Sequence, residues 1–141
     1  MKITCSKSEL RKFKARAGRR YPQEYIETLW GLRDGWRGCD VLLIKVVPQK
    51  GNKHTCGCDQ AGWEKYLEES TDESGLTFLG TIHTHNGNRH MEIPSAADNI
   101  SAIESGERFF GIDCITRLHS GRLKHAVQFW FPQHPIKNTL K

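Results

Sequence analysis

Two histidines and an aspartate with the side-chain types that bind a divalent metal lie between Gly80 and Asn99. The run over 76–82 is apolar and β-favouring, which predicts a strand that ends in the two histidines. Side chains two residues apart share one face of a strand. The pattern therefore predicts two faces, with Leu76, Phe78 and Ile82 on one and Thr77, Leu79, Thr81, His83 and His85 on the other. Both imidazoles could then reach one ion.

Asp98 is the third candidate ligand. Pro94 and Ser95 are typical of a helix start, and apolar residues recur at helical spacing over 96–103, so Asp98 falls in the first turn. A His/His/Asp set would leave one coordination position open for water. Each of the two motifs also has an explanation that involves no metal. Ser-x-x-Asp is typical of a capping box, and a His-x-His pair is often incidental.

A third element lies far upstream, in the segment 21–31 (YPQEYIETLWG), where Glu24 follows Pro22 shortly before a predicted strand. Together the three elements resemble the JAMM/MPN metalloprotease family, also called JAB domains. The signature of this family is a glutamate shortly after a proline, then His-Ser/Thr-His, then Ser-x-x-Asp. The resemblance covers most of the chain. It implies a general base at Glu24, a transition-state hydroxyl at Ser95, and metal ligands at His83, His85 and Asp98.

The chain departs from that signature at a few positions. Asn86 stands where the family often has proline, and Glu27 stands where a small residue, usually glycine, is expected. The loop 86–94 is also longer than the common pattern, and it brings His90 and Glu92 close enough to be substitute ligands. The aspartate is favoured over both, because its Pro-Ser-x-x-Asp context is intact.

The chemistry implied by the resemblance is zinc-dependent hydrolysis. Zinc held by two neutral imidazoles and one carboxylate lowers the pKa of its bound water to about 7. Glu24 would take the proton of that water and pass it to the leaving amine. Ser95 would donate a hydrogen bond to the oxyanion, a contribution of about 2.7–4 kcal/mol for one such donor. Without a metal, Glu24 would be a solvated turn residue and Ser95 a plain helix cap.

The resemblance also implies a substrate class: a peptide or isopeptide bond after the C-terminal Gly-Gly of ubiquitin or a ubiquitin-like protein. A short chain looks more like prokaryotic or phage members, which process ubiquitin-like conjugates, sulfur carriers or other peptides. Two alternatives stay open. One is a non-catalytic interaction module of the same fold that no longer holds metal. The other is a nucleic-acid-associated protein that uses a basic N-terminal helix.

Charge is concentrated at the N-terminus. The formal net charge is +5, yet residues 1–20 carry eight Lys or Arg and one Glu, so the remainder is slightly acidic. A capping box at Ser6–Glu9, an apolar stripe and a stop at Gly18 predict a helix over about 6–18. A solvated helix face is favoured over a nucleic-acid patch, because no aromatic platform or nucleic-acid motif accompanies the charge.

A second cluster of potential ligands competes with the first. His54, Cys56, Cys58 and Asp59 lie within six residues. Cys-x-Cys lacks the usual spacing of a structural zinc site, and no second ligand pair is evident elsewhere. The five cysteines are odd in number and lack a framework-like spacing, which favours reduced thiols over disulfides.

The whole chain, 1–141, is predicted to be one mixed-sheet α/β domain flanked by helices, with the cytidine deaminase-like layering that the resemblance implies. Strands are expected at 25–30, 41–47, 76–82, 109–116 and 123–131, with a loop at 31–40, helices at 59–75 and from Ser95, and a loose tail at about 132–141. No apolar run approaches the roughly 20 residues that span a bilayer, and no secretory signal is evident. A cytoplasmic location is the default expectation.

Overall fold

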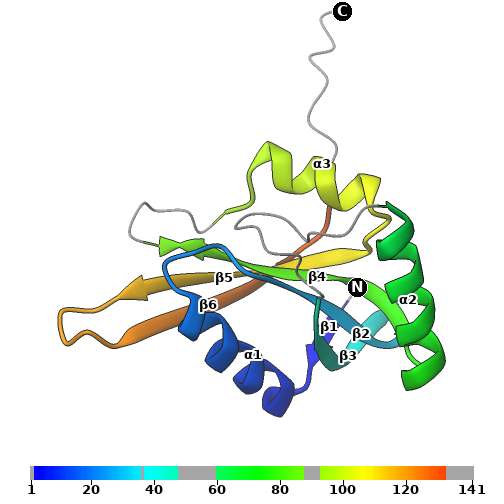
Figure 1. Cartoon of the computed structure of the whole chain (residues 1–141), viewed down its shortest axis with the longest axis horizontal. Coiled ribbons are helices and arrows are strands. Elements are labelled where there is room, and N and C mark those ends of the chain that lie inside the picture. Colours follow the sequence, from blue (N-terminus) through cyan, green and yellow to red (C-terminus); the bar gives the residue numbers. More distant parts are fainter. Residues whose placement is uncertain (1, 36, 48–59, 88–92, 133–141) are drawn as a thin grey trace, which may run out of the picture.

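The computed structural model describes residues 2–35, 37–47, 60–87 and 93–132. They form a six-stranded mixed sheet with three helices (Figure 1), so the predicted mixed α/β domain is confirmed. In chain order the elements are β1 (Lys2–Cys5), α1 (Lys7–Arg20), β2 (Ile26–Asp34), β3 (Gly38–Val46), α2 (Gln60–Ser74), β4 (Thr77–Asn86), α3 (Ala96–Glu104), β5 (Phe109–Arg117) and β6 (Leu123–Trp130).

The sheet order is β1-β3-β2-β4-β5-β6, which places β4 near the middle. The pairs β1/β3 and β4/β5 are parallel, and the other pairs are antiparallel. Glycine at position 80 permits the parallel pairing of β4 with β5, because a Cβ there would lie 1.8 Å from the carbonyl oxygen of Phe109. The strand that carries the histidines therefore has a hydrogen-bonded neighbour on each side.

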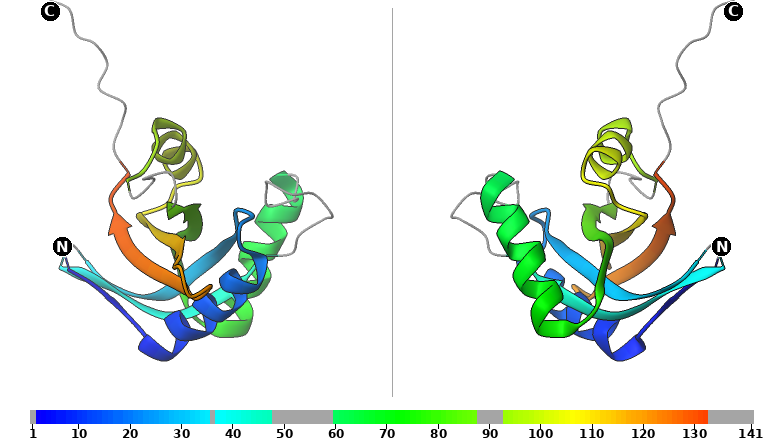
Figure 2. Two further views of the ribbon diagram at one scale, coloured as in Figure 1. Left: turned by 90° about the vertical axis from the view of Figure 1, so that its left-hand side faces the viewer. Right: turned by 90° about the vertical axis from the view of Figure 1, so that its right-hand side faces the viewer.

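Helix α1 covers one face of the sheet, and α2 and α3 lie on the other (Figure 2). On the α1 side, Phe13 stacks on Tyr25 with ring centroids 6.0 Å apart. On the opposite side, Tyr66 of α2 meets Trp30 edge to face at 6.5 Å. Ala102 of α3 is buried against the far end of the same face. The sheet thus separates the basic first helix from the side that carries α3.

The predicted alternation along β4 is wrong in its first half. The register of β4 against β2 shifts beside Leu79, so the alternation of faces breaks there. Leu79 lies in the main core with Ile82 instead of facing the same way as the histidines. Phe78 contacts Trp30 on the opposite side, with centroids 5.6 Å apart. A bulge of this kind moves every preceding side chain to the other face.

The predicted loop over 31–40 is largely strand. β2 continues to Asp34 and β3 begins at Gly38, so only a tight connection remains. Gly31, which suggested a break, instead lies where a Cβ would come within 1.8 Å of the carbonyl oxygen of Asp40. The edge strand β1 has no counterpart among the predicted elements either. Its alternating exposed and half-buried residues bury too little apolar surface to give a clear pattern.

Helix α1 extends past its predicted end. Ser6 caps it by accepting a hydrogen bond from the Glu9 amide at 3.3 Å. The Glu9 carboxylate does not return to the cap; it accepts from the Ile44 amide at 3.1 Å and so ties α1 to β3. Gly18 lies inside the helix, against β6, and the helix ends just before Pro22.

The glutamate at the position where the resemblance expects a small residue is fully buried. Glu27 receives two hydrogen bonds of 2.7 Å from the Arg16 guanidinium and a third from the Tyr25 hydroxyl. Burial, followed by the bond to Glu27, raises the pKa of Tyr25 above its ordinary value. A buried carboxylate is tolerated only when it is paired in this way. The cluster therefore fastens α1 to β2.

Cys5, Cys39 and Cys114 are thiols in the structure, and burial, with the nearby Asp40 and Glu9 carboxylates, raises the pKa of Cys5 to about 11.

No helix in the described part of the chain is long and apolar enough to span a membrane. The predicted tail beyond 132 lies outside the described residues.

Replacing Arg16 with methionine should destabilise the protein strongly, because it leaves the Glu27 carboxylate buried without its partner. The expected loss is about 3–5 kcal/mol in the free energy of unfolding, measured by urea denaturation. Lys12→Met is the matched control, since Lys12 forms an exposed ion pair with Glu9 and should cost at most about 1 kcal/mol. Equal losses in the two variants would contradict the role assigned to Arg16.

Candidate metal centre

The two histidines of β4 face the side of the sheet that carries α3. Ile82 between Thr81 and His83 points into the α1-side core, so its neighbours on either side point the opposite way. The His85 side chain is 4% exposed and that of His83 is 17% exposed. Phe110 of β5 stacks on the His83 ring at 6.1 Å and limits where that ring can move.

Helix α3 brings Asp98 to these histidines. Ser95 is its N-cap, and the capping box is complete: the Asp98 amide donates to Ser95 Oγ at 3.1 Å, and the Ser95 amide donates to Asp98 Oδ2 at 2.8 Å. Oδ1 of the same carboxylate lies 3.3 Å from His83 Nε2, and Oδ2 lies 3.3 Å from His85 Nε2. The capping and ligand explanations of Asp98 are therefore compatible, because one carboxylate makes both sets of contacts.

The geometry of the three side chains fits one metal ion. The two Nε2 atoms lie 3.1 Å apart, and the ligand atoms of His83, His85 and Asp98 all fall within 4.8 Å of one another. Zinc bonds of about 2.0–2.1 Å at tetrahedral angles place neighbouring ligand atoms about 3.3 Å apart. The separations of 3.1–3.3 Å match that edge. These residues could hold a metal ion.

The electrostatics of Asp98 favour a bound cation. Burial acts to raise its pKa, but the hydrogen bonds that the carboxylate accepts from His83, His85 and the Ser95 amide outweigh it and hold the pKa below the ordinary range. The carboxylate is therefore ionised at neutral pH. Two imidazoles and one negative charge converge on one point, which is a donor set that suits zinc.

Glu24 precedes β2, and no described contact joins it to the cluster. The pairing of β2 with β4 ends at Ile26 and His83. Just beyond it, the Thr84 amide donates to the Tyr25 carbonyl and the Tyr25 amide donates to Thr84 Oγ1, both at 2.9 Å. The Glu24 side chain is exposed. Its catalytic role stays a prediction.

Ser95 lies at the solvent side of the cluster and is exposed. Its Oγ accepts from the Asp98 amide, and its hydroxyl hydrogen has no acceptor among the described residues. A donor therefore remains beside the carboxylate. The proposed contact of Ser95 with an oxyanion also stays a prediction.

Two other residues on this face have no counterpart in the sequence analysis. Phe110 covers His83, and the Glu107 carboxylate bonds to Thr81, two residues before that histidine. Neither belongs to a motif. A polar residue between the helix-ending Gly106 and an apolar strand is the one signal that could have drawn attention to Glu107.

The remaining candidate ligands cannot be placed. His90 and Glu92, and the competing cluster His54, Cys56, Cys58 and Asp59, lie outside the described residues.

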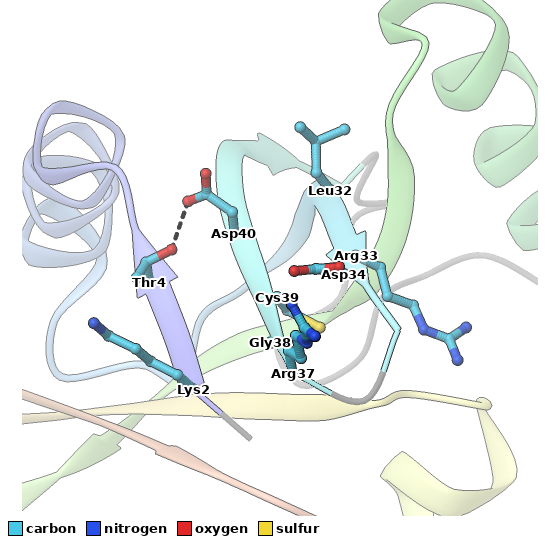
Figure 3. Close-up of a pocket in the computed structure, with 9 residues that line it drawn as sticks. All are labelled: Lys2, Thr4, Leu32, Arg33, Asp34, Arg37, Gly38, Cys39 and Asp40. Carbon is cyan, nitrogen blue, oxygen red and sulfur yellow. Dashed lines mark hydrogen bonds between the residues drawn. The ribbon is translucent and has the colours of Figure 1, made fainter.

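A hollow lies at the opposite end of β2, away from the histidines (Figure 3). Basic and acidic side chains mix around it, and the Thr4 hydroxyl donates to Asp40 Oδ1 at 2.7 Å. None of the predicted site residues lines it. Its lining consists of Lys2, Thr4, Leu32, Arg33, Asp34, Arg37, Gly38, Cys39 and Asp40.

Comparison with known proteins shows the fold. No protein-family model matches the chain, and no curated protein matches it. A solution structure from Desulfitobacterium hafniense is 19% identical with a TM-score of 0.60, covering 91% of this chain and 84% of that one. One from Salinibacter ruber is 19% identical with a TM-score of 0.59, covering 91% and 80%. A JAB1/MPN domain protein from Archaeoglobus fulgidus is 21% identical with a TM-score of 0.48, covering 81% and 77%.

Metal analysis of the purified protein should find about one zinc per chain. His83→Ala and Asp98→Ala should each lose it, because each removes one of the three protein ligands of the site. His119→Ala is the matched control, since His119 is exposed on the β5–β6 turn and should leave the zinc content unchanged. Equal zinc in the wild type and Asp98→Ala would rule out this ligand assignment.

Proposed function

We propose that this protein is a zinc-dependent peptidase or isopeptidase of the JAMM/MPN type. The observation that carries the proposal is the convergence of His83, His85 and Asp98 at the separations of a tetrahedral zinc site. Support also comes from the order of the motif along the chain. The histidines of β4 and the capped start of α3 meet in the structure, and the glutamate precedes β2, the strand that pairs with β4.

The residues present fit a catalytic rather than a closed structural zinc site. Among the described residues, three side chains supply ligand atoms, whereas structural sites use four. Zinc, when bound, would act as a Lewis acid towards a carbonyl oxygen and would acidify a water. The chain itself holds the donor set in place. Asp98 aligns both imidazoles through its two oxygens, and the Ser95 amide fixes the carboxylate in turn.

Glu24 would move the proton in this reaction. It lies two residues before Ile26, which pairs with His83, and its side chain makes no hydrogen bond or ion pair with the described residues. A carboxylate that is not engaged elsewhere can accept a proton from water and deliver it to the leaving amine. The exposed position gives it access to both.

Ser95 would stabilise the negative charge that develops on the carbonyl oxygen. Its Oγ already accepts from the Asp98 amide, which fixes the direction of the hydroxyl, and its hydrogen remains available to donate. A preorganised donor of this kind costs no reorganisation during the reaction.

The substrate class that we propose is a peptide or isopeptide bond after the C-terminal Gly-Gly of ubiquitin or a ubiquitin-like protein, which makes such a conjugate the expected partner. The support for it is the three-part motif alone. An extended Gly-Gly tail also suits a site at the end of paired strands, because glycine residues allow close approach of a peptide backbone.

Glu24→Gln should abolish cleavage of a fluorogenic amide at the C-terminus of ubiquitin while the zinc content stays at the wild-type value. The loss should be at least about 10²–10⁴-fold in kcat, since the amide cannot act as a base. Gln23→Ala, at an exposed neighbouring position, should keep wild-type activity. Undiminished cleavage by Glu24→Gln would exclude it as the base. Zinc binding without cleavage of any Gly-Gly conjugate would favour a non-catalytic module.

Ser95→Ala should lower kcat by about 10²–10³-fold through the lost oxyanion donor. It should also lower the free energy of unfolding by about 0.5–2 kcal/mol through the lost helix cap. Ser95→Thr keeps the hydroxyl and should retain most of both. Kinetics and urea denaturation of the two variants separate the effects. An Ala variant that is less stable but equally active would limit Ser95 to capping.

A further inference from the structure

Helix α3, which carries Asp98, rests lightly on the sheet. Ala102 is the residue of the helix that is buried, and it packs against Phe110 and Ile112. Most of the other residues of α3 are exposed or half-buried. Nine residues give a helix about 13 Å long at about 1.5 Å per residue, so a small tilt about one buried alanine would move its first turn appreciably. The distance from Asp98 to the histidines needs a further restraint.

That restraint lies just beyond the other end of the helix. The Glu107 amide returns to the Ala102 carbonyl at 2.9 Å, and the following Arg108 amide donates to the Leu79 carbonyl at 2.9 Å. These bonds bring Glu107 down onto β4. There its Oε1 accepts from the Thr81 hydroxyl at 2.5 Å.

The hydrogen bond between Thr81 and Glu107 lies in a partly buried position. Thr81 is 7% exposed, and Glu107 is half-buried. Burial raises the pKa of Glu107, while hydrogen bonds from Thr81, and more weakly the electrostatic effect of the nearby His83, act against that rise. The bond is thus shielded from water, where a hydrogen bond to a carboxylate is strong.

We infer that Glu107 is a positioning residue for the metal centre: through Thr81 it fixes the docking of α3 on β4, and thereby the distance between Asp98 and the two histidines. Thr81 lies on the same face of the same strand as both imidazoles. The helix is consequently held at both ends by β4, by Asp98 at its start and by Glu107 after its end. This inference rests on the proposed metal site and adds a supporting shell to it.

The test is the affinity of the full chain for Zn²⁺ alone, measured by competition with a chelating indicator, together with the unfolding free energy of the metal-free protein. Glu107→Ala and Thr81→Val should each weaken zinc binding by about 10–100-fold, as expected for loss of a group that orients ligands. Glu107→Gln and Thr81→Ser retain the acceptor and the donor, and should stay within about threefold of the wild type. The double variant Glu107→Ala/Thr81→Val should be no weaker than either single variant.

Glu104→Ala is the matched control, because Glu104 is an exposed carboxylate in the last turn of α3. It should leave zinc affinity unchanged. Substitution with Co²⁺ adds a spectroscopic readout, since its visible absorption reports the coordination geometry. Glu107→Ala should change that spectrum and Glu104→Ala should not. If Glu107→Ala does not fold, the nearly isosteric Thr81→Val carries the comparison.

Several results would overturn the inference. Wild-type zinc affinity in Glu107→Ala or Thr81→Val, whatever their stability, would limit the pair to a structural role. A loss in Glu107→Gln as large as in Glu107→Ala would point to charge instead of positioning. Absence of zinc binding in the wild type would remove the proposed function itself, and the inference with it. Zinc binding by the wild type, with equal affinity in Glu107→Ala and Thr81→Val, would overturn the inference but leave the proposed function standing.

Discussion

The site depends on one carboxylate that serves two structures at once. Asp98 completes the cap of α3 by accepting from the Ser95 amide at Oδ2, and its two oxygens meet the imidazoles of β4. An aspartate committed to a cap has little rotational freedom, so the helix start and the donor set are fixed together. The pairing of β4 with β2 and the packing of α3 on the sheet together bring the first turn of α3 next to β4.

Much of this arrangement follows from local patterns. The helix start at Ser95, the strand ending in the histidines and the order of the elements all have strong sequence signals. The features that the sequence could not predict depend on contacts between elements far apart in the chain. The bulge at Leu79 exists because β4 must fit β2, and no local pattern marks it. Gly18 does not end its helix, and Gly31, at the start of the predicted loop, lies inside a strand because the neighbouring strand approaches too closely for a side chain.

The site shows the same division. The residue types of the donor set could be predicted, whereas the neighbours that hold it, Phe110 and Glu107, come from elements with no motif of their own. Glu27 looked like a departure from the family signature. The structure accounts for it, because Arg16 and Tyr25 satisfy its charge beneath the sheet. One cation of the basic N-terminal segment, the half-buried Arg16, therefore neutralises a buried carboxylate of the sheet.

Helix α3 is held on β4 by Asp98 at its start and by Glu107 after its end. The position of Asp98 therefore depends little on the number of residues between His85 and Ser95. The two ends of that connection are set by a strand and by a capped helix, so its residues need not position the aspartate. The entropy of closing a loop rises slowly, by about 0.6 kcal/mol for each doubling of its length. Insertions there can change what reaches the site while its chemistry stays the same. This connection is then the place where the chain can change what it recognises without changing its ligand set.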